Sequence, residues 1–102
     1  LFDSIHGLMV KYVGLDQIIE NISHALGNLK EVYLIGDYAQ GRDSGIIDLL
    51  FIGESLNTNL LTHLTQKAEK QIKRKVRYVH FKDKQKLHTP LNEQPHLLLW
   101  QQ

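Results

Sequence analysis

The sequence of 102 residues contains no cysteine, only two prolines and a single tryptophan. Without cysteine, neither a disulfide framework nor a thiolate metal site can form. No apolar run approaches the about 20 residues that a membrane-spanning helix needs, so we expect no membrane partner. The lack of cysteine and of a signal peptide is typical of a cytoplasmic protein, and we expect this location.

The six histidines are scattered, with no pair four residues apart and no His-x-His motif. Histidine metal sites usually show such spacing, so the pattern does not favour one. No serine or threonine has a base at a recognisable motif spacing, and the sequence therefore gives no signal for hydrolase chemistry. We expect no metal and no cofactor.

The composition is that of a globular protein, with 42% hydrophobic and 23% charged residues. The net charge of +1 is unevenly distributed, because residues 67–86 hold nine basic side chains and only Glu69 and Asp83 as acids. Such a segment can mark a nucleic-acid or phosphate surface, or it can be the solvated end of a helix. The cations of residues 67–77 have no aromatic residues between them to stack on bases, which favours the second interpretation.

Hydrophobic spacing predicts a single domain of residues 1–102 in the α+β class. The order is α-α-β-β-α-β followed by an apolar segment, in a small mixed sheet with helices packed on it. The expected elements are a connector helix in residues 1–14, a helix over 15–26, strands over 32–35 and 46–52, a helix from 57–59 to about 73, and a strand over 76–81. Residues 97–100 read equally as a closing strand or a short helix.

Residues 32–51, VYLIGDYAQGRDSGIIDLLF, predict a strand, a glycine-bounded turn and a second strand. This segment resembles the nucleotide-binding hairpin of the minimal nucleotidyltransferases in the DNA polymerase beta-like superfamily. The matching positions are Gly36, Tyr38, Ala39, Gly41 and Asp48. The resemblance implies a nucleotidyltransferase fold whose turn holds a triphosphate with backbone N–H groups. An ordinary tight hairpin is the alternative.

The segment departs from the family pattern at the positions that bind magnesium. In the family two carboxylates on the second strand, two residues apart, hold Mg²⁺ together with a third carboxylate on a later strand. Here Ile46 replaces the first, Asp48 keeps the second, and Arg77 takes the place of the third. Asp37 also replaces the family's serine. These departures predict that the chain is not an enzyme but a degenerate nucleotidyltransferase.

The candidate ligand-binding residues come from the hairpin and the strand after the next helix. They are Gly36, Asp37, Tyr38, Gly41, Arg42, Asp48 and Arg77. A nucleotide or another small anion is the expected ligand. Because a half-buried carboxylate needs a partner, we expect Arg77 or Arg42 to pair with Asp48. Tyr38 is expected to pack beneath the turn.

A narrower resemblance is to the C-terminal domain of bacterial winged-helix transcriptional regulators of the ArsR or MarR type. It implies a ligand-sensing or dimerising module that forms the C-terminal fragment of a longer protein. DNA would then be bound through an N-terminal winged-helix domain outside this sequence, and the chain would be a homodimer. Two alternatives stay open: an active metal-dependent nucleotidyltransferase that uses Asp37, Asp43 and Asp48, and a purely structural protein-interaction domain.

Overall fold

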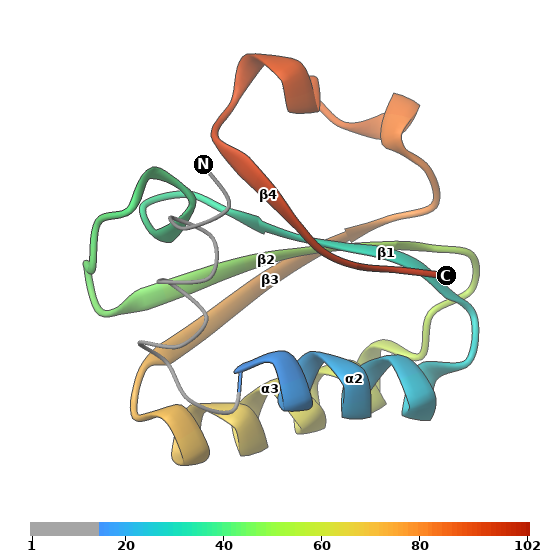
Figure 1. Ribbon diagram of the computed structural model, residues 1–102. Helices are drawn as coiled ribbons and strands as arrows, with labels where there is room; N and C mark the ends of the chain where they lie inside the picture. The colour runs from blue at the N-terminus through green and yellow to red at the C-terminus, as the bar shows by residue number, and fades with distance from the viewer. Residues whose placement is uncertain (1–14) are drawn as a thin grey trace.

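The computed structural model describes residues 15–102 as a four-stranded sheet with two helices on one face (Figure 1). The expected connector helix of residues 1–14 lies outside the described residues. No helix of residues 15–102 is long and apolar enough to cross a membrane. The expected α+β class and mixed sheet are confirmed.

Helix α2, Leu15–Leu26, has the predicted bounds. Its apolar residues recur every three or four positions, so Ile18, Ile19 and Ile22 form one buried stripe. Gly27 ends the helix in the left-handed conformation, with φ at 72°, and donates its N–H to the carbonyl of Ser23 at 3.2 Å.

The four strands form one sheet in the order β3-β2-β1-β4. Strands β2 and β3 are parallel, whereas β1 pairs antiparallel with both β2 and β4. Their bounds are β1 Leu29–Ile35, β2 Ile46–Gly53, β3 Lys75–Phe81 and β4 His96–Gln101. Strand β1 begins three residues earlier than predicted, and the ambiguous segment at 97–100 is a strand.

Helix α3, Thr58–Ile72, connects the parallel strands β2 and β3. A parallel pair needs such a crossover, because its strands start at the same end of the sheet. The Asn57 side chain accepts a hydrogen bond from the Leu60 N–H at 3.0 Å and caps the first turn. The helix ends at Lys73, which adopts a left-handed φ of 56°.

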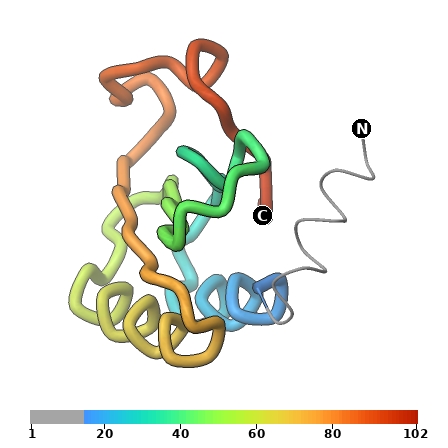
Figure 2. Tube along the Cα trace, turned by 90° about the vertical axis from the view of Figure 1, so that its left-hand side faces the viewer, coloured from blue at the N-terminus to red at the C-terminus, as the bar shows by residue number. Residues whose placement is uncertain are grey.

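The two faces of the sheet are covered differently, as Figures 1 and 2 show. Helices α2 and α3 bury the main core, which includes Val32, Leu34, Ile47, Leu49 and Phe51. On the opposite face, Leu87 and Leu91 from the connection between β3 and β4 cover a smaller cluster of Tyr33, Leu50 and Ile52. Asp48 alternates with Ile47 and Leu49, so it points away from the helices, as predicted.

The packing predicts that two leucine-to-alanine substitutions lower the free energy of unfolding by very different amounts. Leu61→Ala in α3 removes a side chain that is 0% exposed, and we expect a loss of about 2–5 kcal/mol in the free energy of unfolding. Leu98→Ala on β4 is the matched control, because that side chain is 42% exposed and should cost less than about 1 kcal/mol. Urea denaturation measures both. Equal losses would contradict the described core.

Candidate functional site

Asp48 lies where three strands meet, directly against the turn that follows β1. It is opposite Ile35 on β1 and opposite Arg77 on β3. Gly36, the next residue after Ile35, has a φ of 76°. A Cβ atom at Gly36 would lie 2.7 Å from Oδ2 of Asp48. Glycine is therefore required twice at this position, for its left-handed backbone and for the close approach of the carboxylate.

Arg77 binds Asp48 through two parallel hydrogen bonds. Its Nε donates to Oδ1 at 2.8 Å and its Nη2 donates to Oδ2 at 3.1 Å. The hydrogen bond and then the charge of Asp48 raise the pKa of the Arg77 guanidinium above its ordinary value. Asp48 is 22% exposed and Arg77 is 59% exposed, so the pair lies at the surface of the sheet. The expected pairing is confirmed for Arg77 and not for Arg42.

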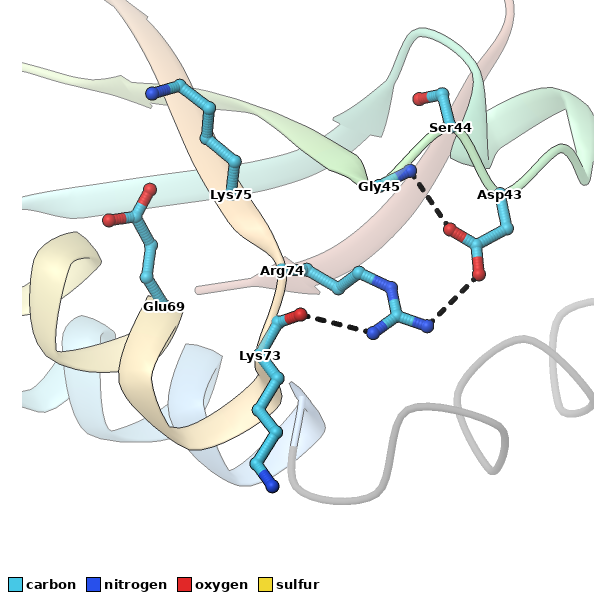
Figure 3. A pocket seen from close by; sticks show the side chains of 7 residues that line it. All are labelled: Asp43, Ser44, Gly45, Glu69, Lys73, Arg74 and Lys75. Carbon is cyan, nitrogen blue, oxygen red and sulfur yellow. Dashed lines mark hydrogen bonds and ion pairs between the residues drawn. The ribbon is translucent and has the colours of Figure 1, made fainter.

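A second pair fixes the hairpin loop to the start of β3 (Figure 3). Arg74 donates from Nη2 to Oδ2 of Asp43 at 3.1 Å and from Nε to the Tyr38 hydroxyl at 3.0 Å. The Tyr38 hydroxyl and the Gly45 N–H both donate to Oδ1 of Asp43. The hydrogen bond that Arg74 donates to Asp43, and then the one that it donates to Tyr38, raise the pKa of the Arg74 guanidinium above its ordinary value. Tyr38 is buried beneath the turn, as predicted, but its polar contacts were not expected.

A third pair, on the solvent side of the turn, joins Asp37 to Arg42. Nη2 of Arg42 lies 3.3 Å from Oδ1 of Asp37 and donates to Oε1 of Gln40 at 2.7 Å. The negative charge that replaces the family's serine is therefore compensated from within the turn. Each aspartate at or next to the hairpin, Asp37, Asp43 and Asp48, has its own arginine partner.

The backbone of the turn is largely occupied by its own hydrogen bonds. Residues Tyr38–Gln40 form a 3₁₀ helix that ends at Gly41 with a φ of 82°. The N–H groups of residues 39–42 donate to carbonyl oxygens of residues 36–38 at 2.9 to 3.1 Å. These four donors are not available to a phosphate in this conformation. The resemblance implies that these backbone groups hold a phosphate, whereas in this conformation an anion at the turn would have to be bound mainly by side chains.

The residues present do not fit the magnesium site of the family. Ile46, two residues before Asp48, has no oxygen donor and lies opposite Lys75 on β3. Both oxygens of Asp48 already accept hydrogen bonds from Arg77. Within residues 15–102 no three side chains of the histidine, cysteine, aspartate or glutamate type are grouped to hold a metal ion. The alternative set of Asp37, Asp43 and Asp48 is thus divided among three arginines.

An open cleft of about 750 Å³ lies beside the hairpin, between its loop and the turn from α3 to β3 (Figure 3). Its lining residues are Asp43, Ser44, Gly45, Glu69, Lys73, Arg74 and Lys75. The Glu69 carboxylate accepts the Val76 N–H at 2.7 Å. Three consecutive cations at residues 73–75 line this cleft, and the side chains of Lys73 and Lys75 extend in opposite directions from it (Figure 3).

Three solved structures resemble this fold. The first is a toxin–antitoxin with AMP-PNP, which has 22% identity over 86% of this chain and 74% of that chain, with a TM-score of 0.65. The second is a protein of Sulfolobus solfataricus described as a nucleotidyltransferase, with 23% identity over 97% and 87% and a TM-score of 0.59. The third is a tri-AMPylated HEPN toxin of Shewanella oneidensis in complex with MNT antitoxin, with 20% identity over 85% and 70% and a TM-score of 0.60.

The chain has a nucleotidyltransferase fold. The sequence matches no protein-family model, and no curated protein matches it. At these identities the structural likeness establishes the arrangement of strands and helices rather than an activity.

The same comparisons overturn the expectation of a non-catalytic module from a winged-helix transcriptional regulator. The three structures belong to a nucleotidyltransferase and to toxin–antitoxin proteins, one of them with AMP-PNP and one with an AMPylated toxin. None of the three is described as a transcriptional regulator, and the expectation that the chain is not an enzyme is wrong. That expectation took the missing carboxylates, at Ile46 and Arg77, as evidence of missing nucleotide chemistry.

The close approach of Gly36 to Asp48 predicts a specific stability difference. Gly41→Ala places a side chain at a φ of 82° with no atom within 4 Å, and should cost about 1–2 kcal/mol. Gly36→Ala has similar backbone strain and also a Cβ 2.7 Å from Asp48, and should cost about 2–4 kcal/mol. Urea denaturation measures both losses. In an Asp48→Ala background the gap between them should shrink, and an unchanged gap would contradict the contact.

The buried hydroxyl of Tyr38 gives a second prediction. Tyr38→Phe keeps the ring but removes the hydrogen bonds to Asp43 and Arg74, and should lower the free energy of unfolding by about 1–3 kcal/mol. Tyr78→Phe is the matched control, because its hydroxyl bonds the Thr62 hydroxyl at 2.6 Å in an exposed setting and should cost less than about 1 kcal/mol. Denaturation curves of both variants decide whether the hairpin loop depends on this contact.

Proposed function

We propose that this chain is a nucleotidyltransferase, which transfers a nucleoside monophosphate from a nucleoside triphosphate to a hydroxyl group of an acceptor. The observation that carries the proposal is the contact of Gly36 with Asp48 on a nucleotidyltransferase fold. The turn glycine and the second-strand carboxylate of the family hairpin are both kept here and lie against each other. The likeness to a toxin–antitoxin with AMP-PNP supports the same chemistry.

The proposed reaction forms one bond and breaks one. The acceptor oxygen bonds to the α-phosphorus of the nucleotide, and the bond between that phosphorus and the bridging oxygen of the β-phosphate breaks. Pyrophosphate leaves with the electron pair of the broken bond, and the proton of the acceptor hydroxyl passes to a carboxylate. Asp48 is the carboxylate on this face of the sheet that suits the role.

The cations around the hairpin suit the charge that this reaction develops. Phosphoryl chemistry is catalysed mainly by positioning and by electrostatic stabilisation, to which arginine contributes strongly. Arg77 is held by Asp48, and Lys75 lies two residues earlier on the same strand. Because side chains alternate along a strand, both project to the face that carries Asp48. They are placed to stabilise the phosphates before and during transfer.

The proposal predicts transfer of the α-phosphate and not of the γ-phosphate. The protein is incubated with each of four nucleoside triphosphates, labelled at the α- or the γ-phosphate, and with a cell extract as the source of acceptors. We expect label from the α-position alone in protein or RNA, accompanied by release of pyrophosphate. Asp48→Asn should lower the rate by about 100-fold or more, because the proton acceptor is lost and Arg77 is released.

The matched control is Asp83→Asn, which removes a carboxylate that caps the 3₁₀ helix Lys84–Lys86 after β3. This variant should retain wild-type transfer. Transfer that is absent with all four nucleotides, or that is equal in wild type and Asp48→Asn, would refute the proposed activity.

A further inference from the structure

The face of the sheet that carries Asp48 has more positive than negative charge. Ile46 and Asp48 of β2 lie opposite Lys75 and Arg77 of β3 in the parallel register. All four side chains project to the same face, because residues paired across a parallel ladder point to the same side of the sheet. Two cations therefore share this patch with the Asp48 carboxylate, where the family has carboxylates on both strands. The charge of Asp37 also acts on Arg77, but Asp37 has a cation of its own in Arg42.

Arg77 retains donors after it has bound Asp48. A guanidinium has five N–H groups in a planar fork, and two of them donate to the Asp48 carboxylate. The other three have no hydrogen-bond partner among residues 15–102, and the side chain is 59% exposed. A guanidinium held in this way can bind a phosphate with its second edge while the carboxylate keeps its orientation.

A divalent cation at the same place would meet three obstacles. It would have to displace Arg77 from both oxygens of Asp48. It would have no second carboxylate ligand at Ile46, and it would be repelled by the positive charges of Arg77 and Lys75. Since the N–H groups of residues 39–42 are used inside the turn, side-chain cations remain as the main partners for the phosphates.

We propose that this domain binds a nucleoside triphosphate without a divalent cation, with Arg77 as the principal phosphate ligand and Lys75 beside it. The inference rests on the proposed function for the identity of the ligand. The proposed function is nucleotidyl transfer, whereas the point here is that no divalent cation accompanies the bound nucleotide. The arginine takes over the charge neutralisation that magnesium supplies in a carboxylate-lined site.

The test measures binding separately from transfer. The probes are the α,β-methylene analogues of the four nucleoside triphosphates, which bind but cannot release their nucleotidyl group. Isothermal titration calorimetry gives the dissociation constant of each analogue with excess Mg²⁺ and with EDTA in its place. For the nucleotide that binds best, we expect the two constants to agree within about twofold.

Arg77→Gln should weaken binding by about tenfold or more in EDTA, because charge-assisted hydrogen bonds to phosphate are lost. Arg77→Lys should restore part of the affinity, since it keeps the charge but not the planar fork. The matched control is Lys82→Gln, which removes an exposed cation paired with Glu54, and it should leave binding unchanged. Circular dichroism and a denaturation curve for each variant separate weakened binding from unfolding.

The outcomes distinguish this inference from the proposed function. Binding that needs Mg²⁺ and weakens by about tenfold or more in EDTA would overturn the inference and leave nucleotidyl transfer standing. Equal binding by wild type and Arg77→Gln would also overturn it, because another group would then hold the phosphates. No binding by any analogue under either condition would refute both the inference and the proposed function.

Discussion

The site depends on the position of one carboxylate, which is held between a glycine backbone and a guanidinium. Asp48 has β1 on one side and β3 on the other, so its location is set by an antiparallel pairing and a parallel pairing at once. Gly36 allows the turn to close over it, and Arg77 compensates its charge. Gly36 and Arg77 both contact the Asp48 carboxylate, so a change at any of these three residues alters the surroundings of the other two.

Arginine and aspartate pairs give this hairpin a different electrostatic character from a metal-binding hairpin. A cluster of carboxylates repels a nucleotide until a metal ion binds, whereas each arginine–aspartate pair described here has no net charge. Phosphates can compete with an exposed carboxylate such as Asp37 for its arginine, since a guanidinium binds both groups with the same fork geometry. The exposed pairs are thus exchangeable contacts, while the pair of Asp43 and Arg74 is more enclosed and fixes the loop.

Most of the fold could be predicted from the sequence, because its signals are local. The stripe of α2 and the glycine after it defined that helix to the residue. The early start of β1 was missed, because exposed Lys30 interrupts the apolar pattern after buried Leu29. Residues 97–100 were ambiguous, because a short apolar run has no period and only the pairing of β4 with β1 makes it a strand.

The site was predictable only where the family spacing carried the information. The pair of Asp48 and Arg77 follows from the order of the strands, and it was expected. The contact of Asp43 with Arg74 was not, because both residues lie in connections outside the strands, where the family spacing defines no position. It depends on the register in which Lys75 donates its N–H to the Gly45 carbonyl at 3.1 Å. The expectation of a non-catalytic regulator module was drawn from the absent metal ligands at Ile46 and Arg77, which bear on how a metal binds and not on which proteins share the fold.

Strand β3 lies at an edge of the sheet formed by residues 15–102, where no strand of these residues pairs with its outer side. The Glu69 carboxylate accepts a hydrogen bond from one backbone donor of β3, the Val76 N–H. Such an edge can recruit a strand from another molecule, and charged side chains are a common means of preventing it. Lys75 and Arg77 within β3, and Lys82 directly after it, place cations along this edge, and a second copy would bring the same charges against them. These basic residues therefore also disfavour the addition of a fifth strand at this edge, and neutralising them for any purpose removes a barrier to aggregation.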